Sequence, residues 1–183
     1  MHPREAKTLT RTEQPVRQRD EENCGMKRLL GLLAIIAMSS TAFAADLFFP
    51  DPKDTPGAMS PEVTQANILE TVCQSAWLEK IRPSASYIDE LKAKQIEALQ
   101  LNGGPTDYQE DHLVPLCAGG HPTDPRNLWP QRASGDWNYK VKDGFETWVC
   151  KSLCRGNLTL EAAQGAFLEP DWRRRYMQWV QVE

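Results

Sequence analysis

The sequence lacks an excess of positive charge, paired CxxC motifs, internal repeats and low-complexity tracts. Lys and Arg number 21 against 25 Asp and Glu, so the formal net charge is -4 and general binding to polyanions is disfavoured. The missing CxxC pairs argue against a structural zinc site, and the missing repeats argue against a repeat architecture. What is present, 40% hydrophobic and 25% charged residues in a chain of 183, is typical of a single globular domain.

An apolar run lies near the N-terminus, but it is too short to span a bilayer comfortably. Residues 26–44 combine a basic start, this run and a small-residue motif, namely Lys27-Arg28, Leu29 to Met38 and Ala42-Phe43-Ala44. That order is typical of a secretory signal peptide. We expect translation to begin at Met26, which makes residues 1–25 a non-native extension; the alternative is a cytoplasmic extension before an uncleaved anchor. The mature chain is then periplasmic or secreted, without stable membrane association.

Charge is unevenly distributed after the expected cleavage. Residues 45–183 carry 14 basic and 20 acidic side chains. Residues 45–125 hold 5 basic and 13 acidic side chains, whereas residues 126–183 hold 9 and 7. Any site for a polyanion is therefore expected toward the C-terminal side.

Four cysteines remain in the mature chain, and an even number in an exported chain predicts two disulfides with three possible pairings. A structural zinc site is the alternative. Cys150 and Cys154 lie one turn apart on a predicted helix, where a bridge between them fits poorly. Our working pairing is Cys73–Cys150, which leaves Cys117–Cys154.

The pattern of caps, breakers and apolar spacing predicts an α+β fold that is mainly helical, with one short antiparallel β-hairpin followed by a helix. Residues 45–59 are expected to form an extended leader and residues 60–183 a single domain. The expected helices are Ser60 to about Leu78, Ser86 to Leu101, Asp136 to Leu153, 157 or 159 to Phe167, and 170 to about 182. The expected strands are His112 to Leu116 and Asn127 to Trp129.

Residues suited to hydrolytic chemistry gather in the hairpin and the helix after it. Asp111 and His112 are adjacent, Asn127 follows fifteen residues later, and the helix carries Asn138, Lys142 and Asp143. Carboxylate and amide oxygens suit Mg²⁺, and a neutral imidazole accepts a proton from water. Glu146 is four residues after Lys142, so an ion pair is as plausible a role for it as catalysis.

This segment resembles the HNH endonucleases, also called His-Me finger or ββα-metal nucleases, and is most similar to small exported bacterial members. The matching motifs are Asp111-His112-Leu113-Val114-Pro115-Leu116, Gly119-Gly120, Asn127-Leu128-Trp129-Pro130-Gln131 and Trp137-Asn138…Lys142-Asp143…Glu146. The resemblance implies a ββα core at about 107–153. It also implies His112 as general base, Asp111 as metal ligand, and Asn127 as a brace that lets the His112 carbonyl steer the imidazole.

The sequence departs from the family at the second metal ligand, because no histidine follows His121. Asn138 is the best substitute and Asp143 its rival, and these oxygen ligands favour Mg²⁺ or Mn²⁺. Lys142 is expected to meet non-bridging phosphate oxygens, with Arg126 and Lys140 as further nucleic-acid contacts.

The expected function is metal-dependent hydrolysis of phosphodiester bonds in DNA, with backbone contacts and little sequence specificity; RNA stays open as a substrate. The alternative is a catalytically inactive HNH-like, disulfide-stapled periplasmic binding or scaffold protein. A toxin-like effector is a third option and would need an immunity protein as partner.

Overall fold

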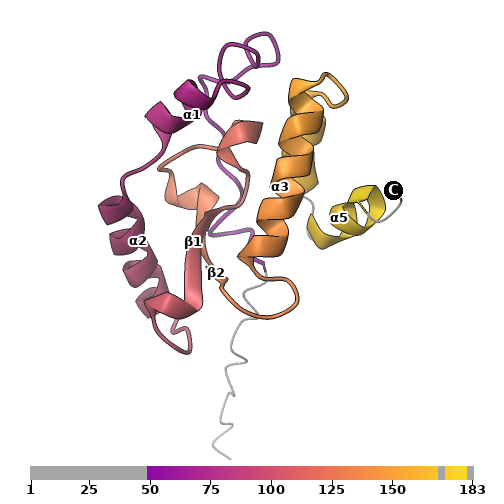
Figure 1. The fold of residues 1–183 in the computed structure, drawn as a ribbon. Coiled ribbons are helices and arrows are strands. Elements are labelled where there is room, and N and C mark those ends of the chain that lie inside the picture. Colours follow the sequence, from indigo (N-terminus) through magenta and orange to yellow (C-terminus); the bar gives the residue numbers. More distant parts are fainter. Residues whose placement is uncertain (1–48, 169–171, 181–183) are drawn as a thin grey trace, which may run out of the picture. The chain divides into compact units, whose positions relative to one another are not determined.

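The computed structural model describes residues 49–168 and 172–180, and the expected extension, signal peptide and first leader residues lie outside this part. The helices are α1 (Ser75–Ile81), α2 (Ala85–Ala98), α3 (Tyr139–Cys154), α4 (Leu160–Leu168) and α5 (Trp172–Val180), and the strands are β1 (Tyr108–His112) and β2 (Leu128–Arg132). Figure 1 shows α2 on one side of the hairpin and α3 on the other. The predicted α+β fold, mainly helical with one hairpin, is confirmed.

The hairpin is antiparallel, with Tyr108 opposite Arg132 and His112 opposite Leu128. A first strand over His112 to Leu116 was wrong, because β1 ends at His112. Beyond it the Val114 N–H donates to the Asn127 side chain at 2.9 Å, and Pro115 has no N–H to offer a ladder. The chain therefore turns into a 3₁₀ helix, η2 (Leu116–Ala118).

Gly120 allows a close approach of backbone within this loop. A Cβ on Gly120 would lie 1.8 Å from the Val114 carbonyl oxygen and 2.7 Å from Asn127 Nδ2. Neither group has room to retreat, since both belong to the hydrogen-bonded loop. Glycine is therefore needed at the second position of the Gly119-Gly120 motif, because any larger residue would clash with this loop.

The helix expected from Ser60 to about Leu78 was also wrong, because turns occupy most of residues 61–73 and α1 begins only at Ser75. The Asn67 side chain accepts from the Thr64 N–H at 2.8 Å and donates to the Glu62 carbonyl at 2.9 Å. Such local side-chain bonds compete with the helical pattern. The described part of the leader is also bound to the domain, since Gly57 N–H donates to the Arg126 carbonyl.

Helix α3 supplies the centre of the main hydrophobic core. Phe145, Val149 and Leu153 on one face are fully buried, and the first two belong to the apolar stripe expected from the sequence. They pack with residues of the 61–73 turns, of α4 and of the start of α5. No helix within residues 49–168 and 172–180 has the length and apolar character needed to cross a membrane.

Two disulfides are present, but their pairing corrects the expected one: Cys73 is bonded to Cys154, and Cys117 to Cys150. The reason is the order in which the chain lies along α3. The loop after β1 reaches α3 one turn before its end, so Cys117 meets Cys150, while the turns before α1 reach the last residue of that helix, Cys154. Disulfides persist in oxidising compartments, so the two bonds fit a chain that resides outside the cytoplasm.

Candidate functional site

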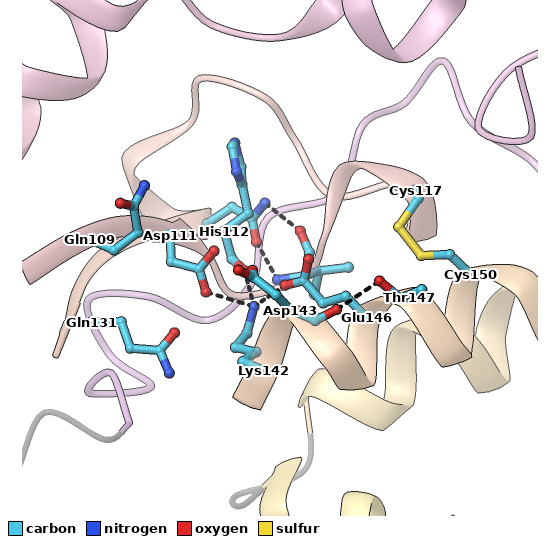
Figure 2. Close-up of polar contacts among 12 residues, drawn as sticks. Gln109, Asp111, His112, Cys117, Gln131, Lys142, Asp143, Glu146, Thr147 and Cys150 are labelled. Carbon is cyan, nitrogen blue, oxygen red and sulfur yellow. Dashed lines mark hydrogen bonds and ion pairs between the residues drawn. A yellow bond between two sulfur atoms is a disulfide. The ribbon is translucent and has the colours of Figure 1, made fainter. Parts of the chain in front are cut away.

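Three carboxyl groups meet where β1 faces α3. Asp111 comes from the strand, and Asp143 and Glu146 come from the helix, three residues apart and so on one side of it. One ligand atom from each lies within 4.8 Å of the others, and Figure 2 shows the three side chains converging. They line a cleft of about 680 Å³.

The Lys142 ammonium is buried beside these carboxyl groups. Lys142 Nζ lies 2.8 Å from Asp111 Oδ2, forms an ion pair with Glu146 Oε1, and donates to the His112 carbonyl at 2.6 Å (Figure 2). The side chain has no exposed surface, so the expected contact between Lys142 and phosphate is wrong. The expected ion pair with Glu146 is confirmed, and Lys142 ties strand to helix.

Burial and neighbouring charges shift the pKa values of this cluster. Burial alone would lower the pKa of Lys142, yet the neighbouring charges of Asp111 and Glu146 raise it well above its ordinary value. Burial raises the pKa of Glu146, the Lys142 ammonium opposes that rise, and Asp111 adds to it. Burial and the Asp111 charge likewise raise the pKa of Asp143. A further cation near these carboxylates would relieve their mutual repulsion.

The donor set fits a hard divalent cation. Asp143 is exposed to the cleft, while Asp111 and Glu146 are part-buried and each has one oxygen that Lys142 does not engage. Carboxylate oxygens at this spacing are ligands suited to Mg²⁺ or Mn²⁺. Asp111, Asp143 and Glu146 are therefore the residues that could hold a metal.

The His112 ring is fixed by the backbone of the following loop. Its Nε2 lies 2.9 Å from the Pro122 carbonyl oxygen, which can only accept, so Nε2 carries the hydrogen. In the neutral ring Nδ1 is then the nitrogen that can accept a proton. Burial lowers the pKa of His112, and the Lys142 and Arg82 charges add to that effect, while the Pro122 bond and Asp111 oppose it. The net shift favours the neutral ring.

Asn127 braces the loop, as expected. It is fully buried; its Oδ1 accepts from the Val114 N–H, and its Nδ2 donates to the carbonyls of Val114 and His121 at 3.0 and 3.1 Å. The expected partner of the imidazole was wrong, because the His112 carbonyl accepts from Lys142 and the Pro122 carbonyl orients the ring.

The other expected ligands and contacts lie elsewhere. Asn138 caps α3: its Oδ1 accepts from the Lys140 N–H at 2.9 Å and its Nδ2 donates to the Gly135 carbonyl at 2.6 Å, so its amide is already engaged. The Arg126 guanidinium pairs with Asp124 at 2.7 Å, and this bond holds the pKa of Asp124 down at about 2. Neither Arg126 nor the exposed Lys140 lines the cleft.

Sequence reasoning missed two residues that line the cleft, Glu110 and Arg82. Glu110 is buried and its two carboxyl oxygens have no hydrogen-bond partner among the described residues. Burial, with a contribution from Asp111, raises its pKa to about 8 against the opposing charge of Lys92. Strand alternation from the buried Tyr108 would have placed Glu110 inward, had the strand been located correctly.

Comparisons of the chain with family models, with curated proteins and with solved structures give no match. The resemblance to HNH endonucleases thus rests on the motif between Asp111 and Glu146.

Proposed function

We propose that this protein is an exported, metal-dependent endonuclease of the HNH type that hydrolyses phosphodiester bonds in DNA with little sequence specificity. The family, the periplasmic or secreted location, the metal and the substrate are all part of what we propose. The observation that carries it is an imidazole and a carboxylate cluster in one cleft, contributed by β1 and α3.

In this proposal His112 acts as the general base. Its Nδ1 takes a proton from water, whose oxygen attacks phosphorus, and the bond to the 3′ oxygen breaks. The 3′ oxygen leaves as an alkoxide and takes a proton from solvent water. The lowered pKa of His112 suits this role, because a protonated ring has no free nitrogen to accept a proton. The Pro122 carbonyl holds the tautomer, and Asn127 holds the loop that carries Pro122.

Asp111 and Asp143, with Glu146 beside them, hold a divalent cation in this proposal. Mg²⁺ or Mn²⁺ bound there supplies Lewis-acid stabilisation of the negative charge that develops on the leaving oxygen. In this scheme one oxygen of Asp111 pairs with the Lys142 ammonium, and the other oxygen binds the cation.

A second candidate function has one observation in its favour. Lys142 already neutralises part of the charge on Asp111 and Glu146, so the cluster has a resident cation without any metal. An inactive, disulfide-stapled binding or scaffold protein would need nothing more. The two functions differ in whether the cluster and His112 perform chemistry.

Plasmid nicking separates the two functions. The purified chain is incubated with supercoiled plasmid and Mg²⁺ or Mn²⁺, with and without EDTA, alongside His112→Ala and Asp143→Asn. We expect metal-dependent nicking that falls by about 100- to 10,000-fold in His112→Ala, the range that a general base contributes. Asp89→Asn, which removes an exposed carboxylate on α2, is the matched control and should nick like the wild type.

Equal nicking by wild type and His112→Ala would remove the catalytic role of the imidazole. An intact plasmid with the wild-type chain in both metals would favour the scaffold.

A further inference from the structure

The cleft has a second wall that the site described so far does not use. One wall carries the carboxyl groups and His112, and the other is the corner between α1 and α2, where Leu78, Arg82 and Pro83 lie. Of the described residues that line the cleft, Arg82 is the only lysine or arginine. A phosphodiester entering beside carboxylates needs a positive partner, and Lys142 is enclosed on the far side of that cluster.

Local sequence fixes where Arg82 sits. It is the C-cap of α1, with φ -59° and ψ 128°, and its N–H donates to the Leu78 carbonyl at 3.1 Å. Pro83 disfavours helical backbone in the residue before it, so the helix ends at this point. Arg82 therefore lies at the corner between α1 and α2, and the helix does not continue through it.

The Arg82 side chain is exposed, and its guanidinium makes no hydrogen bond or ion pair with the described residues. Its charge nevertheless reaches His112, where it contributes to the lowered pKa of the ring. The Arg126 guanidinium, by contrast, is paired with Asp124. Arg82 is thus an available cation within electrostatic range of the general base.

We propose that Arg82 binds a non-bridging oxygen of the phosphodiester that lies between His112 and the carboxylate cluster. This inference rests on the proposed function, because it places the substrate of that same site. The guanidinium offers paired N–H donors that match two phosphate oxygens, which a lysine ammonium does not. The nucleic-acid backbone then crosses the corner between α1 and α2, in the acidic N-terminal part of the domain rather than in the more basic C-terminal part.

Two measurements test this placement with Arg82→Ala, Arg82→Lys and the control Lys80→Ala, which removes an exposed cation from the last turn of α1 outside the cleft lining. The first is the KM for plasmid nicking. The second is the affinity for a fluorescein-labelled DNA duplex by anisotropy, in a His112→Ala background with Mg²⁺ and at several salt concentrations. The second measurement separates binding from cleavage.

We expect Arg82→Ala to raise KM and Kd by about 10-fold or more, the effect of losing a hydrogen bond to a charged group. The slope of log affinity against log salt should become shallower by about one, since one phosphate contact is lost. Arg82→Lys should restore the slope and only part of the affinity, and Lys80→Ala should change neither. A purely structural role for Arg82 would leave the salt slope unchanged.

The outcomes separate the two proposals. If the wild type nicks DNA and Arg82→Ala matches Lys80→Ala in KM and salt slope, the placement of the phosphate is wrong while the nuclease stands. If the wild type does not nick but binds DNA with an Arg82-dependent slope, the nuclease fails and the phosphate contact stands. If neither the wild type nor Arg82→Ala binds DNA, both the nuclease and the phosphate contact are overturned.

Discussion

The two ends of α3 are held in place by different chemistry. Toward its start, Lys142 is joined to β1 by an ion pair with Asp111 and a hydrogen bond to the His112 carbonyl, and Glu146 pairs with Lys142 within the helix. Two turns further, at the same four-residue spacing, Cys150 and Cys154 are joined to other segments by disulfides. The helix thus passes from a polar attachment to a covalent one.

The difference follows from what each end has to do. A covalent bond resists separation whatever the pH or salt concentration, so the cystine end can hold the turns before α1 and the loop after β1. Ion pairs between charged groups weaken with salt and pH, and the proposed uptake of a cation and a phosphate would require such exchangeable contacts. The covalent end is therefore the more permanent of the two attachments.

The largest predicted effect comes from breaking the covalent end. Cys73→Ser with Cys154→Ser opens a bond that spans 81 residues, and the chain-entropy relation gives a loss of about 4.5 kcal/mol in the free energy of unfolding. The loss is measured by urea unfolding followed by tryptophan fluorescence.

The shorter bond serves as the comparison for that experiment. Cys117→Ser with Cys150→Ser opens a separation of 33 residues and should cost about 0.8 kcal/mol less by the same relation. A larger loss from the shorter bond would mean that local packing, and not chain entropy, dominates the covalent end.

The next effect comes from breaking the polar end. Lys142→Met leaves Asp111 and Glu146 without their buried cation and should lower the free energy of unfolding by about 3 kcal/mol, near the low end for a broken buried pair. The loss should be near the low end of that range because the side chains of Asp111 and Glu146 keep 13% and 19% of their surface exposed and can take up a proton. Urea unfolding at neutral pH measures the loss.

Lys151→Met is the control for that substitution, since it removes an exposed lysine from the last turn of the same helix. It should leave the unfolding midpoint near the wild-type value. Lys142→Met with wild-type stability would show that the ion pairs contribute little and that packing alone holds β1 against α3.

A further effect is a dependence of stability on pH at Glu110 of β1. Folding raises the pKa of Glu110 from 4.5 to about 8, so the folded chain binds more protons than the unfolded one between these values. Stability should therefore fall as pH rises through this window, by at most about 1.4 kcal/mol per pH unit. Urea unfolding at about pH 5 and about pH 8 measures the fall.

Glu110→Gln, which resembles the protonated acid, should lose most of that dependence, with the exposed Glu97→Gln as the control. An unchanged dependence in Glu110→Gln would assign it to Glu146 and Asp143, whose pKa values burial also raises. The disulfides should respond to none of these conditions.

The sequence predicted those features that local pattern controls. The apolar stripe of α3 and the bracing role of Asn127 follow from helical spacing and from a motif whose residues are close in sequence. Glu110 was missed because the expected strand began four residues late, at His112, and so left Glu110 outside it. The burial of Lys142 was missed because it depends on Asp111 of β1 meeting α3, a contact between segments distant in the sequence. The disulfide pairing depends on how distant segments lie along α3, which no local pattern records.

The bond from His112 Nε2 to the Pro122 carbonyl has a consequence for mutational robustness. A main-chain oxygen chooses the tautomer, and no substitution at a neighbouring side chain removes that oxygen. Exchanges in the loop can therefore accumulate without altering the protonation pattern of the ring, as long as the path of the backbone is kept. Selection on this loop would then act on its shape and leave most of its residues free to diverge.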